Sequence, residues 1–427
     1  MDGTSIVRRP PFGSNPLVGE RGSDTQRKIL GAALEVFAEV GFNDARVELI
    51  TKRAGCSRPA FYQYFSSKDE LFWQLAAQLA HEMVQLGHRL AEVTPDADGI
   101  AHLEQWIDEL MQLYGDYAPV FSAFQAASRD HDEMVQGSSG TSERLGTDLL
   151  RAFGIQGRGR RNITLATSLV AVLLRCSYHW RAVDAAAVEH DRFVAGLARV
   201  VHRLLAGPID DVNVVHQSPT TRSVPQVPSA PAADGAALRP RGQKTRQLLL
   251  DAGAAVLPAR GYHDARVDDI VDAAGVSHGS FYRYFDNKED FFRVLAEEAT
   301  AGMVELLDAF PLDGTDAELR AWSEKWFDTY ESNGGVISTW QEMHPGTTEL
   351  VSFGQQVAST VMARMMAMLD DRGFGDSLVD ALVLLAVFER VPYSVYTLRF
   401  TTRDEAIDAM VTIVRRGLMG HDDDPLK

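Results

Sequence analysis

Cysteine is scarce in this chain, and long apolar runs are missing. Cys56 and Cys176 are the two cysteines among 427 residues, too few for a disulfide framework or a cysteine-based zinc site. No apolar run has the length that crosses a bilayer, and residues 1–16 lack the apolar core of a secretory signal. We therefore expect a cytoplasmic protein without a membrane partner.

Sequence signatures of catalysis and of metal binding are missing as well. The chain has no phosphate-binding glycine loop, nucleophile elbow or HExxH motif. Glu189, His190 and Asp191 are adjacent, but adjacent residues on a helix point in different directions and rarely hold one ion. We expect no enzymatic activity, no cofactor and no metal site.

The net charge of −17 is unusual for a protein that binds nucleic acid, so its distribution matters. Residues 21–70 hold eight basic and seven acidic residues, and residues 239–290 hold eight of each. Nearly all the excess negative charge lies elsewhere. An acidic body with two less acidic tips would repel DNA everywhere except at the tips. The alternative is that the charge only keeps the protein soluble.

One segment of about 50 residues occurs twice. Residues 41–76 read GFNDARVELITKRAGCSRPAFYQYFSSKDELFWQLA, and residues 261–296 read GYHDARVDDIVDAAGVSHGSFYRYFDNKEDFFRVLA. Without a gap back to Thr25 and Thr245, 21 of 52 positions are identical. The chain is therefore expected to consist of two units of roughly 200 residues each.

The repeated segment has the pattern of a helix-turn-helix. Ser23 and Gln26 resemble a capping box at the start of a first helix that Gly41 ends. A second helix is predicted for 47–54, and a third runs from Ser57, its N-cap, through Phe65. A long fourth helix begins at Lys68, and the second copy repeats the pattern up to Lys288.

Helical periodicity continues after each copy, and there is almost no strand signal, so the fold class is all-α. Further helices are predicted for 100–117, 118–136, 141–153, 161–182, 187–206, 315–333, 347–371, 376–399 and 403–418. The stretch 207–241 has six prolines among Ser, Thr and Ala and no periodicity. This composition predicts a linker that spans on the order of 30 Å.

The predicted domain order follows from the repeat and the linker. It comprises a flexible arm (1–22), a helix-turn-helix domain (23–68), a helical regulatory domain (69–206), the linker (207–241), a second helix-turn-helix domain (242–288), a second regulatory domain (289–420) and a tail (421–427).

The third helix of each copy has the face that a recognition helix needs. Phe61 and Phe65 fall on one side and can dock on the first helix. Arg58, Pro59, Tyr62 and Gln63 fall on the other, which would enter a major groove, as would His278, Gly279, Tyr282 and Arg283 in the second copy. Gln63 could read adenine and Arg58 guanine. The alternative for the aromatic residues is an ordinary core.

These residues resemble the DNA-binding domain of the tetracycline-repressor (TetR) family. The match is a Gly-hydrophobic-Ser turn, Phe-Tyr-x-Tyr-Phe and a Lys-acid-x-Leu/Phe start, from Ser57 to Leu71 and from Ser277 to Phe291. The resemblance implies a repressor that acts as a homodimer and releases DNA when a small molecule binds. It also implies that phosphates are held by Tyr62, Tyr64 and Lys68 and by Tyr282, Tyr284 and Lys288. The turn residues Ser57, Ser277 and Ser280 complete the predicted interface.

Both copies depart from the family pattern in the same way. A Thr or Ser commonly precedes the second helix in this family, and here Arg46 and Arg266 occupy that position. An arginine has no oxygen that could cap the helix. We expect both to contact phosphate or a groove edge, and the alternative is a solvated surface arginine. Three interpretations stay open: both copies bind DNA, only one does, or neither does.

The resemblance also implies that the last two helices of each unit form a four-helix bundle. The candidates are 161–182 with 187–206 and 376–399 with 403–418, and LVAVLLRCSYHW (169–180) is similar to LLAVFERVPYSV (384–395). We expect the two pairs to pack on each other within one chain as an intramolecular pseudo-dimer, with a homodimer as the alternative. The residues expected to be buried there are Val170, Leu173, Leu174, Leu384, Leu385 and Val387.

Large aromatic residues precede those helices and are candidates for an effector pocket. By the resemblance, an apolar or aromatic effector would contact Trp106, Tyr117, Phe121, Phe124, Trp326, Tyr330 and Trp340. The alternative for each is the ordinary core of a helical domain.

Together these patterns predict a sequence-specific, DNA-binding transcriptional regulator. It would be a ligand-responsive repressor that binds double-stranded DNA as a covalent pseudo-dimer on an asymmetric operator. The alternative is an interaction module of the same fold, whose acidic body binds another protein and which has weak or no DNA binding.

Overall fold

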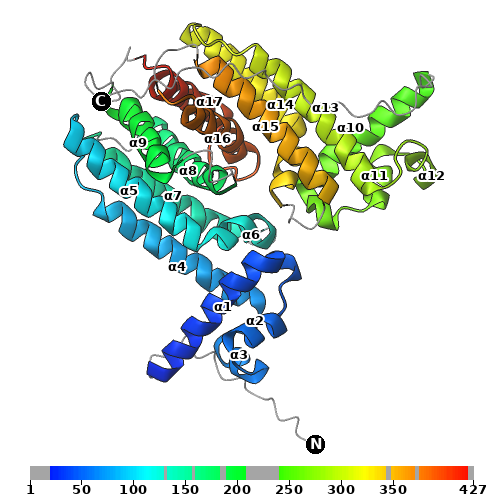
Figure 1. Cartoon of the computed structure of the whole chain (residues 1–427). Helices are drawn as coiled ribbons and strands as arrows, with labels where there is room; N and C mark the ends of the chain where they lie inside the picture. Colours follow the sequence, from blue (N-terminus) through cyan, green and yellow to red (C-terminus); the bar gives the residue numbers. More distant parts are fainter. Residues whose placement is uncertain are drawn as a thin grey trace, which may run out of the picture. The chain divides into compact units, whose positions relative to one another are not determined.

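The computed structural model describes residues 20–128, 132–155, 159–182, 189–207, 240–342, 348–370 and 375–421. Every regular element in these ranges is a helix (Figure 1). None of these helices is long and apolar enough to cross a membrane. Most of the expected arm, linker and tail lies outside the described residues.

Contacts divide the chain into two compact units that do not follow the repeat. One comprises Met1–Met83 and Leu113–Gln136, and the other comprises Val84–Gln112 and Gly137–Lys427. The division falls within α4 (Lys68–Arg89) and α5 (Ala97–Asp116), two long helices of the first half. Each unit is described by itself.

The first unit contains the first helix-turn-helix, formed by α1 (Glu20–Asp44), α2 (Val47–Ala54) and α3 (Arg58–Tyr64). Ile29, Ile50 and Phe61 have no exposed surface and form its core. Helix α1 also packs against α6 (Ala118–Ser128). The expected N-cap at Ser23 is wrong, because α1 already begins at Glu20. The expected end at Gly41 is present as a break with φ 76°.

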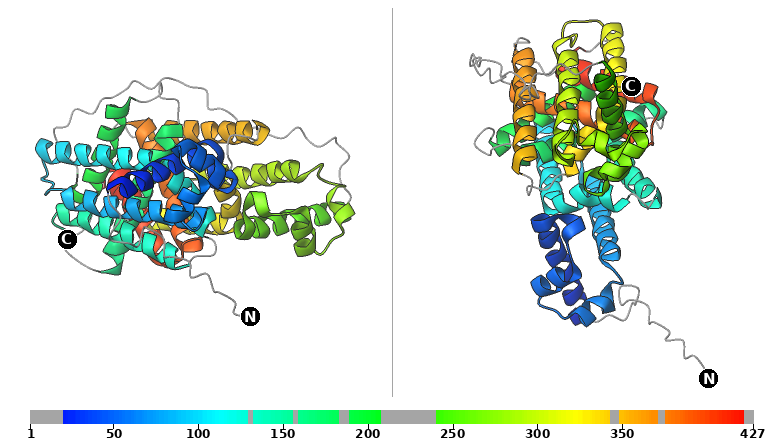
Figure 2. Two further views of the ribbon diagram at one scale, coloured as in Figure 1. Left: turned by 90° about the horizontal axis from the view of Figure 1, so that it is seen from below. Right: turned by 90° about the vertical axis from the view of Figure 1, so that its right-hand side faces the viewer.

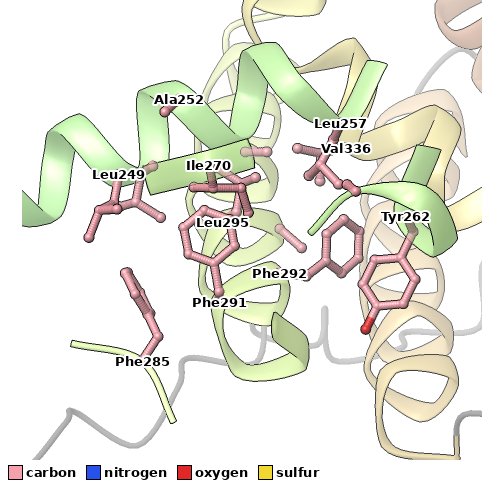
Figure 3. Packing of buried hydrophobic residues seen from close by; sticks show 14 of the residues in the cluster. Leu249, Ala252, Leu257, Tyr262, Ile270, Phe285, Phe291, Phe292, Leu295 and Val336 are labelled. Carbon is pink, nitrogen blue, oxygen red and sulfur yellow. The ribbon is translucent and has the colours of Figure 1, made fainter. Parts of the chain in front are cut away.

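The second unit contains the second copy, formed by α10 (Pro240–Asp264), α11 (Val267–Ala274), α12 (His278–Phe281) and α13 (Lys288–Asp308). Its core is one apolar cluster in which Phe291 and Leu295 of α13 lie beneath α10 and α11 (Figure 3). The same residue types at the same spacing thus build the same local fold twice.

Helix boundaries differ from the prediction after each copy. Of the expected helix 118–136, the structure describes α6, which ends at Ser128, and the start of α7 (Asp132–Ala152); residues 129–131 lie outside the described residues. In the second half α14 (Asp316–Glu342) extends beyond the expected 333, and α15 (Thr348–Asp370) follows it. Helical periodicity runs through both places, so the pattern alone does not locate the ends.

A bundle in the second unit joins helices from both halves of the sequence (Figures 1 and 2). Helix α8 (Arg160–Ala182) packs on α16 (Ser377–Tyr396) and α17 (Arg403–Thr412), and α9 (His190–Ala206) packs on α16 and on the π-helix η2 (Ile413–Leu418). Of the residues expected in it, Val170, Leu173, Leu384 and Val387 are at most 2% exposed. Leu174 and Leu385 are only half-buried, which corrects the prediction for these two.

The bundle has an approximate two-fold symmetry that reciprocal contacts reveal. Arg203 Nη1 on α9 donates to Gly417 O on η2 at 2.8 Å, and Arg416 Nε on η2 donates to Leu204 O on α9 at 2.9 Å. When 190–207 is aligned with 403–420, Arg203 corresponds to Arg416 and Leu204 to Gly417. One contact is therefore made twice in opposite directions, as across the axis of a symmetric dimer.

Candidate nucleic-acid interface

The recognition helix of the first copy is fixed by its turn and its cap. Gly55 has a left-handed backbone (φ 66°), which glycine adopts without strain. Ser57 Oγ accepts a hydrogen bond from the Ala60 N–H at 3.2 Å, as expected for an N-cap. Phe61 and Phe65 have no exposed surface, whereas Tyr62 is 47% exposed. The predicted outward face is present, and its residues Arg58, Pro59, Tyr62 and Gln63 are all exposed.

The recognition helix of the second copy is shorter than expected. Helix α12 ends at Phe281, and Tyr282 begins a turn. Two differences in sequence account for this. Gly279, a poor helix former, replaces Pro59 in the first turn. Ser280 replaces Ala60, and the Ser277 Oγ atom forms a hydrogen bond with Ser280 Oγ at 2.8 Å instead of capping the helix. The expected contact residues His278, Gly279, Tyr282 and Arg283 are nevertheless exposed, and Ser280 is half-buried.

The remaining aromatic candidates are more enclosed than the resemblance implies. Tyr64 is 9% exposed, and its ring packs against Phe65 at 6.5 Å between centroids. Tyr284 is half-buried against Phe285 at the same distance. Most of each ring contacts protein, so a contact with phosphate is restricted to the edge that remains exposed.

Lys68 and Lys288 hold the end of the first helix of their copies. Lys68 Nζ donates to Phe42 O at 2.6 Å and lies 4.3 Å from the centroid of the Phe42 ring. Lys288 Nζ donates to Tyr262 O at 2.7 Å and to Ala265 O at 3.0 Å. Burial lowers the pKa of both ammonium groups. Both lysines are half-buried, so any contact with phosphate would be shared with these carbonyl oxygens.

Arg46 and Arg266 occupy equivalent N-cap positions with extended backbones and are exposed. No side chain caps α2 at Arg46. At Arg266, the Asp269 carboxylate accepts from the backbone N–H at 2.9 Å. The guanidinium groups of Arg46 and Arg266 take no part in these backbone interactions. The predicted contact of each guanidinium with DNA is therefore compatible with the structure.

An acidic residue lies beside the first basic residue of each recognition helix. Arg58 Nη1 is 2.8 Å from Glu48 Oε1, and His278 Nε2 is 3.1 Å from Asp268 Oδ1. The four side chains are between 52% and 72% exposed. Our sequence interpretation missed this pair. Alignment of the two copies could have found it, because an acidic residue and a basic residue recur at the same two positions.

Each described aromatic candidate for an effector pocket contacts a residue of its own unit. Trp106 Nε1 donates to Leu86 O at 3.1 Å, Tyr117 Oη to Glu82 Oε1 at 2.7 Å, and Trp326 Nε1 to Phe388 O at 3.0 Å. Tyr330 stacks on Tyr396 at 6.2 Å. Phe121 stacks on Tyr114 at 4.6 Å, and Phe124 meets Trp73 edge-on at 6.0 Å. Trp106, Tyr117, Trp326 and Tyr330 are buried, whereas Phe121 and Phe124 are half-buried. The side chain of Trp340 lies outside the described residues.

A groove of about 560 Å³ lies between α1 and α4 in the first unit. It is lined by Leu30, Leu34 and Leu75 and by the polar residues Gln78, His81 and Glu82, among others. None of the aromatic candidates lines it. Among the described residues, no group of three or more His, Cys, Asp or Glu side chains is placed to hold a metal ion.

Comparisons with known proteins agree with these motifs. The family described as "Bacterial regulatory proteins, tetR family" matches residues 29–75 and 249–295. The chain is 40% identical over 101 residues to the transcriptional regulator AcuR of Cereibacter sphaeroides, covering 24% of this chain and 46% of that protein. It is 32% identical over 99 residues to the HTH-type transcriptional regulator BetI of Yersinia pestis, covering 22% and 50%.

A third relative, also a regulator, matches a shorter stretch of the chain. The chain is 37% identical over 60 residues to the fatty acid metabolism regulator protein of Bacillus subtilis, covering 14% of this chain and 31% of that protein. In each case it spans half or less of the relative's length. The family match occurs once in each copy, so the chain carries two segments that match the tetR family of bacterial regulatory proteins.

Proposed function

We propose that this protein is a DNA-binding transcriptional regulator whose two unlike recognition helices read one asymmetric operator. The observation that carries the proposal is the exposure of equivalent faces in both copies, with different residues on them. Arg58, Pro59, Tyr62 and Gln63 are exposed in the first, and His278, Gly279, Tyr282 and Arg283 in the second. Two different sets of side chains would select two different half-sites.

In this proposal some exposed side chains read bases and others contact phosphate. Gln63 reads adenine and Arg58 reads guanine through bidentate hydrogen bonds in the major groove, and Arg283 reads guanine in the other half-site. Tyr62, Tyr282, Arg46 and Arg266 contact the phosphate backbone and carry no sequence information. The near-neutral charge of both segments, within a chain of net charge −17, directs DNA towards these surfaces.

In this proposal the chain acts as a covalent pseudo-dimer. The packing of α8 and α9 on α16, α17 and η2 supports it, because the bundle connects the two halves. The half-sites should lie about one helical turn apart, or a multiple of it. Release from DNA would follow binding of a small apolar or aromatic effector. Because Trp106, Tyr117, Trp326 and Tyr330 are buried, an effector that contacts any of them would have to displace neighbouring side chains.

The test is selection of bound duplexes from a random pool with the purified chain, followed by the same selection with Gln63→Ala and Arg283→Ala. We expect a motif with two unlike half-sites, and each substitution should relax only one of them. A palindrome would mean that one copy reads bases in a pairing of two chains. No enrichment at low salt would contradict DNA reading and favour a protein-interaction module.

A salt titration separates these outcomes further. An interface with several phosphate contacts loses affinity steeply as the salt concentration rises. A slope near zero would contradict the regulator proposal even if some binding remained.

A further inference from the structure

The two long helices at the centre of the bundle have related sequences that differ at a charged position. Aligning 169–180 with 384–395 places Arg175 opposite Arg390 and Tyr178 opposite Tyr393. Both arginines stack on their tyrosines, with 4.1 Å from guanidinium to ring centroid in α8 and 4.8 Å in α16. The equivalent positions directly before the two arginines hold Leu174 in α8 and Glu389 in α16.

Glu389 forms a buried ionic cluster with the first half. Its Oε2 atom lies 2.5 Å from Arg175 Nε and 2.9 Å from His179 Nε2. The side chains of Arg175, His179 and Glu389 are only 7%, 11% and 14% exposed. Water therefore contributes little to solvating the charges, and the Glu389 carboxylate compensates the charge of Arg175.

The cluster is made once, although the approximate symmetry offers two places for it. Under the reciprocal relation that Arg203 and Arg416 display, the counterpart of the Arg175–Glu389 pair is Arg390 with Leu174. A leucine offers no carboxylate. The two bundle faces are therefore unlike: α8 presents an arginine that needs an acid, and α16 supplies one.

We propose that Glu389 makes the bundle face of the first half dependent on the second half, so that a first half pairs with a second half and not with another first half. Two α8 faces in the same geometry would bury Arg175 twice against Leu174, without an acid. Removing one partner of a buried ion pair is strongly unfavourable because the remaining charge is uncompensated. The inference does not depend on DNA binding.

The second half is not restricted in this way, because α16 carries both an acid, Glu389, and an arginine, Arg390. Two α16 faces in the same geometry would place Arg390 against Glu389 twice, so their charges would be matched. In a dimer of two chains in which first half packs on first half and second half on second half, however, both copies of Arg175 would lack the Glu389 carboxylate. Pairing within one chain satisfies every Arg175 and is favoured further by the covalent connection.

The test uses the complex after cleavage at a protease site introduced into the segment 208–239. Tagged and untagged complexes are mixed and incubated, and native mass spectrometry counts the pairs. We expect first–second pairs and no first–first pairs. The substitution Leu174→Glu gives the first half its own acid, so first–first pairs should appear. Abundant first–first pairs in the unsubstituted protein would overturn the proposal, as would their absence with Leu174→Glu.

A second measurement determines how strongly the first half depends on the acid. Glu389→Leu gives both faces a leucine at this position and leaves Arg175 without its acid. We expect the affinity between the cleaved halves to fall by about 100-fold or more, and Arg175→Leu in the same protein should restore most of it. An affinity that stays within about threefold in the single variant would contradict the proposal.

The intact chain gives an independent answer if the cleaved halves aggregate. Denaturant unfolding would compare Arg175→Leu, Glu389→Leu and the double variant, with Leu174→Glu as the matched change at the equivalent position. We expect each single removal to lower the midpoint and the double variant to recover it. Leu174→Glu should retain the midpoint by pairing with Arg390. Additive losses in the double variant would overturn the proposal, and so would a loss with Leu174→Glu as large as that with Glu389→Leu.

Discussion

Arg58 on the recognition helix of the first copy forms an ion pair with Glu48 on the preceding helix, at 2.8 Å between Nη1 and Oε1. The equivalent residues His278 and Asp268 approach to 3.1 Å. Both pairs lie at the start of the surface that is proposed to enter the major groove. A base or a phosphate that contacts Arg58 therefore has to compete with a carboxylate of the same domain.

Glu48→Gln should raise the affinity for DNA of any sequence. The substitution removes a negative charge from the interface and frees the guanidinium, while the amide keeps the size of the side chain. Because the pair is more than half exposed, its removal should change folding stability by less than about 1 kcal/mol. Binding isotherms at several salt concentrations would measure the effect. Unchanged affinity, or weaker affinity for nonspecific duplexes, would contradict the competition.

Lys68→Met should destabilise the first helix-turn-helix as well as alter its DNA binding. The ammonium group donates to Phe42 O at 2.6 Å and to Asn43 O at 3.3 Å. Loss of charged hydrogen bonds to carbonyl oxygens lowers the free energy of unfolding by about 1.5–3 kcal/mol. Denaturant unfolding would show this, and Lys28→Met, on the exposed surface of α1, is the matched control.

The same variants test the role that the family resemblance gives to this lysine. With Lys68→Met and Lys288→Met together, affinity should fall alike for all sequences if both ammonium groups also contact phosphate. A shift in sequence preference would contradict that role. Equal effects of Lys68→Met and Lys28→Met on unfolding would contradict the stabilising role.

The repeat determined how much of the interface was predictable from sequence. Comparison of two copies separates positions that keep an apolar residue, such as Phe61 and Phe281, from positions that vary on the outer face, such as Gln63 and Arg283. Burial follows this division. The cap at Ser57 and the glycine turn at Gly55 were predictable because their chemistry is local.

Features that depend on tertiary packing were not predictable in this way. The family resemblance implied a phosphate contact for Tyr64, and only the packing of its ring against Phe65 reveals the burial. Glu389 reads as one more acidic residue in an acidic chain until α16 lies against α8. Helix α14 extends to Glu342, beyond the predicted end at 333, because the helical pattern does not locate that boundary.

Acid should destabilise the bundle in two stages. Burial lowers the pKa of His179, and this exceeds the opposite effect of Glu389. The unfolded chain therefore takes up the proton more readily, and stability falls as the pH drops below about 6.5, the value of an unfolded histidine. Burial raises the pKa of Glu389, but Arg175 and then His179 lower it further, with a net decrease. Its contribution is present at higher pH and is lost below about 4.3.

Denaturant unfolding at pH 7.5 and 5.5 would measure the first stage. Burial also lowers the pKa of His202, so both histidines contribute to the same range. His179→Asn should reduce the loss of stability between the two pH values, and His179→Asn with His202→Asn should reduce it further. A double variant whose loss equals that of the unsubstituted protein would show that other groups govern this range.

Gly196→Ala should weaken the contact between the halves at a second place, remote from the charges. A Cβ atom at Gly196 on α9 would lie 2.7 Å from Val379 Cγ1 on α16, closer than carbon atoms can approach. Overpacking of this kind lowers the free energy of unfolding by about 1–3 kcal/mol. This loss should exceed the gain of roughly 1 kcal/mol that alanine brings to a helix. Denaturant unfolding is the measurement.

Two controls separate crowding from other effects of the alanine. Gly302→Ala on α13 adds the same methyl group to open space, so it should stabilise the chain by about 0.4–1 kcal/mol. Val379→Ala removes the methyl groups that Gly196→Ala would meet, so the combination should be less destabilised than the sum of the two single changes. If Gly196→Ala raised the midpoint as Gly302→Ala is expected to do, α9 and α16 would not approach as closely at this glycine as the structure places them.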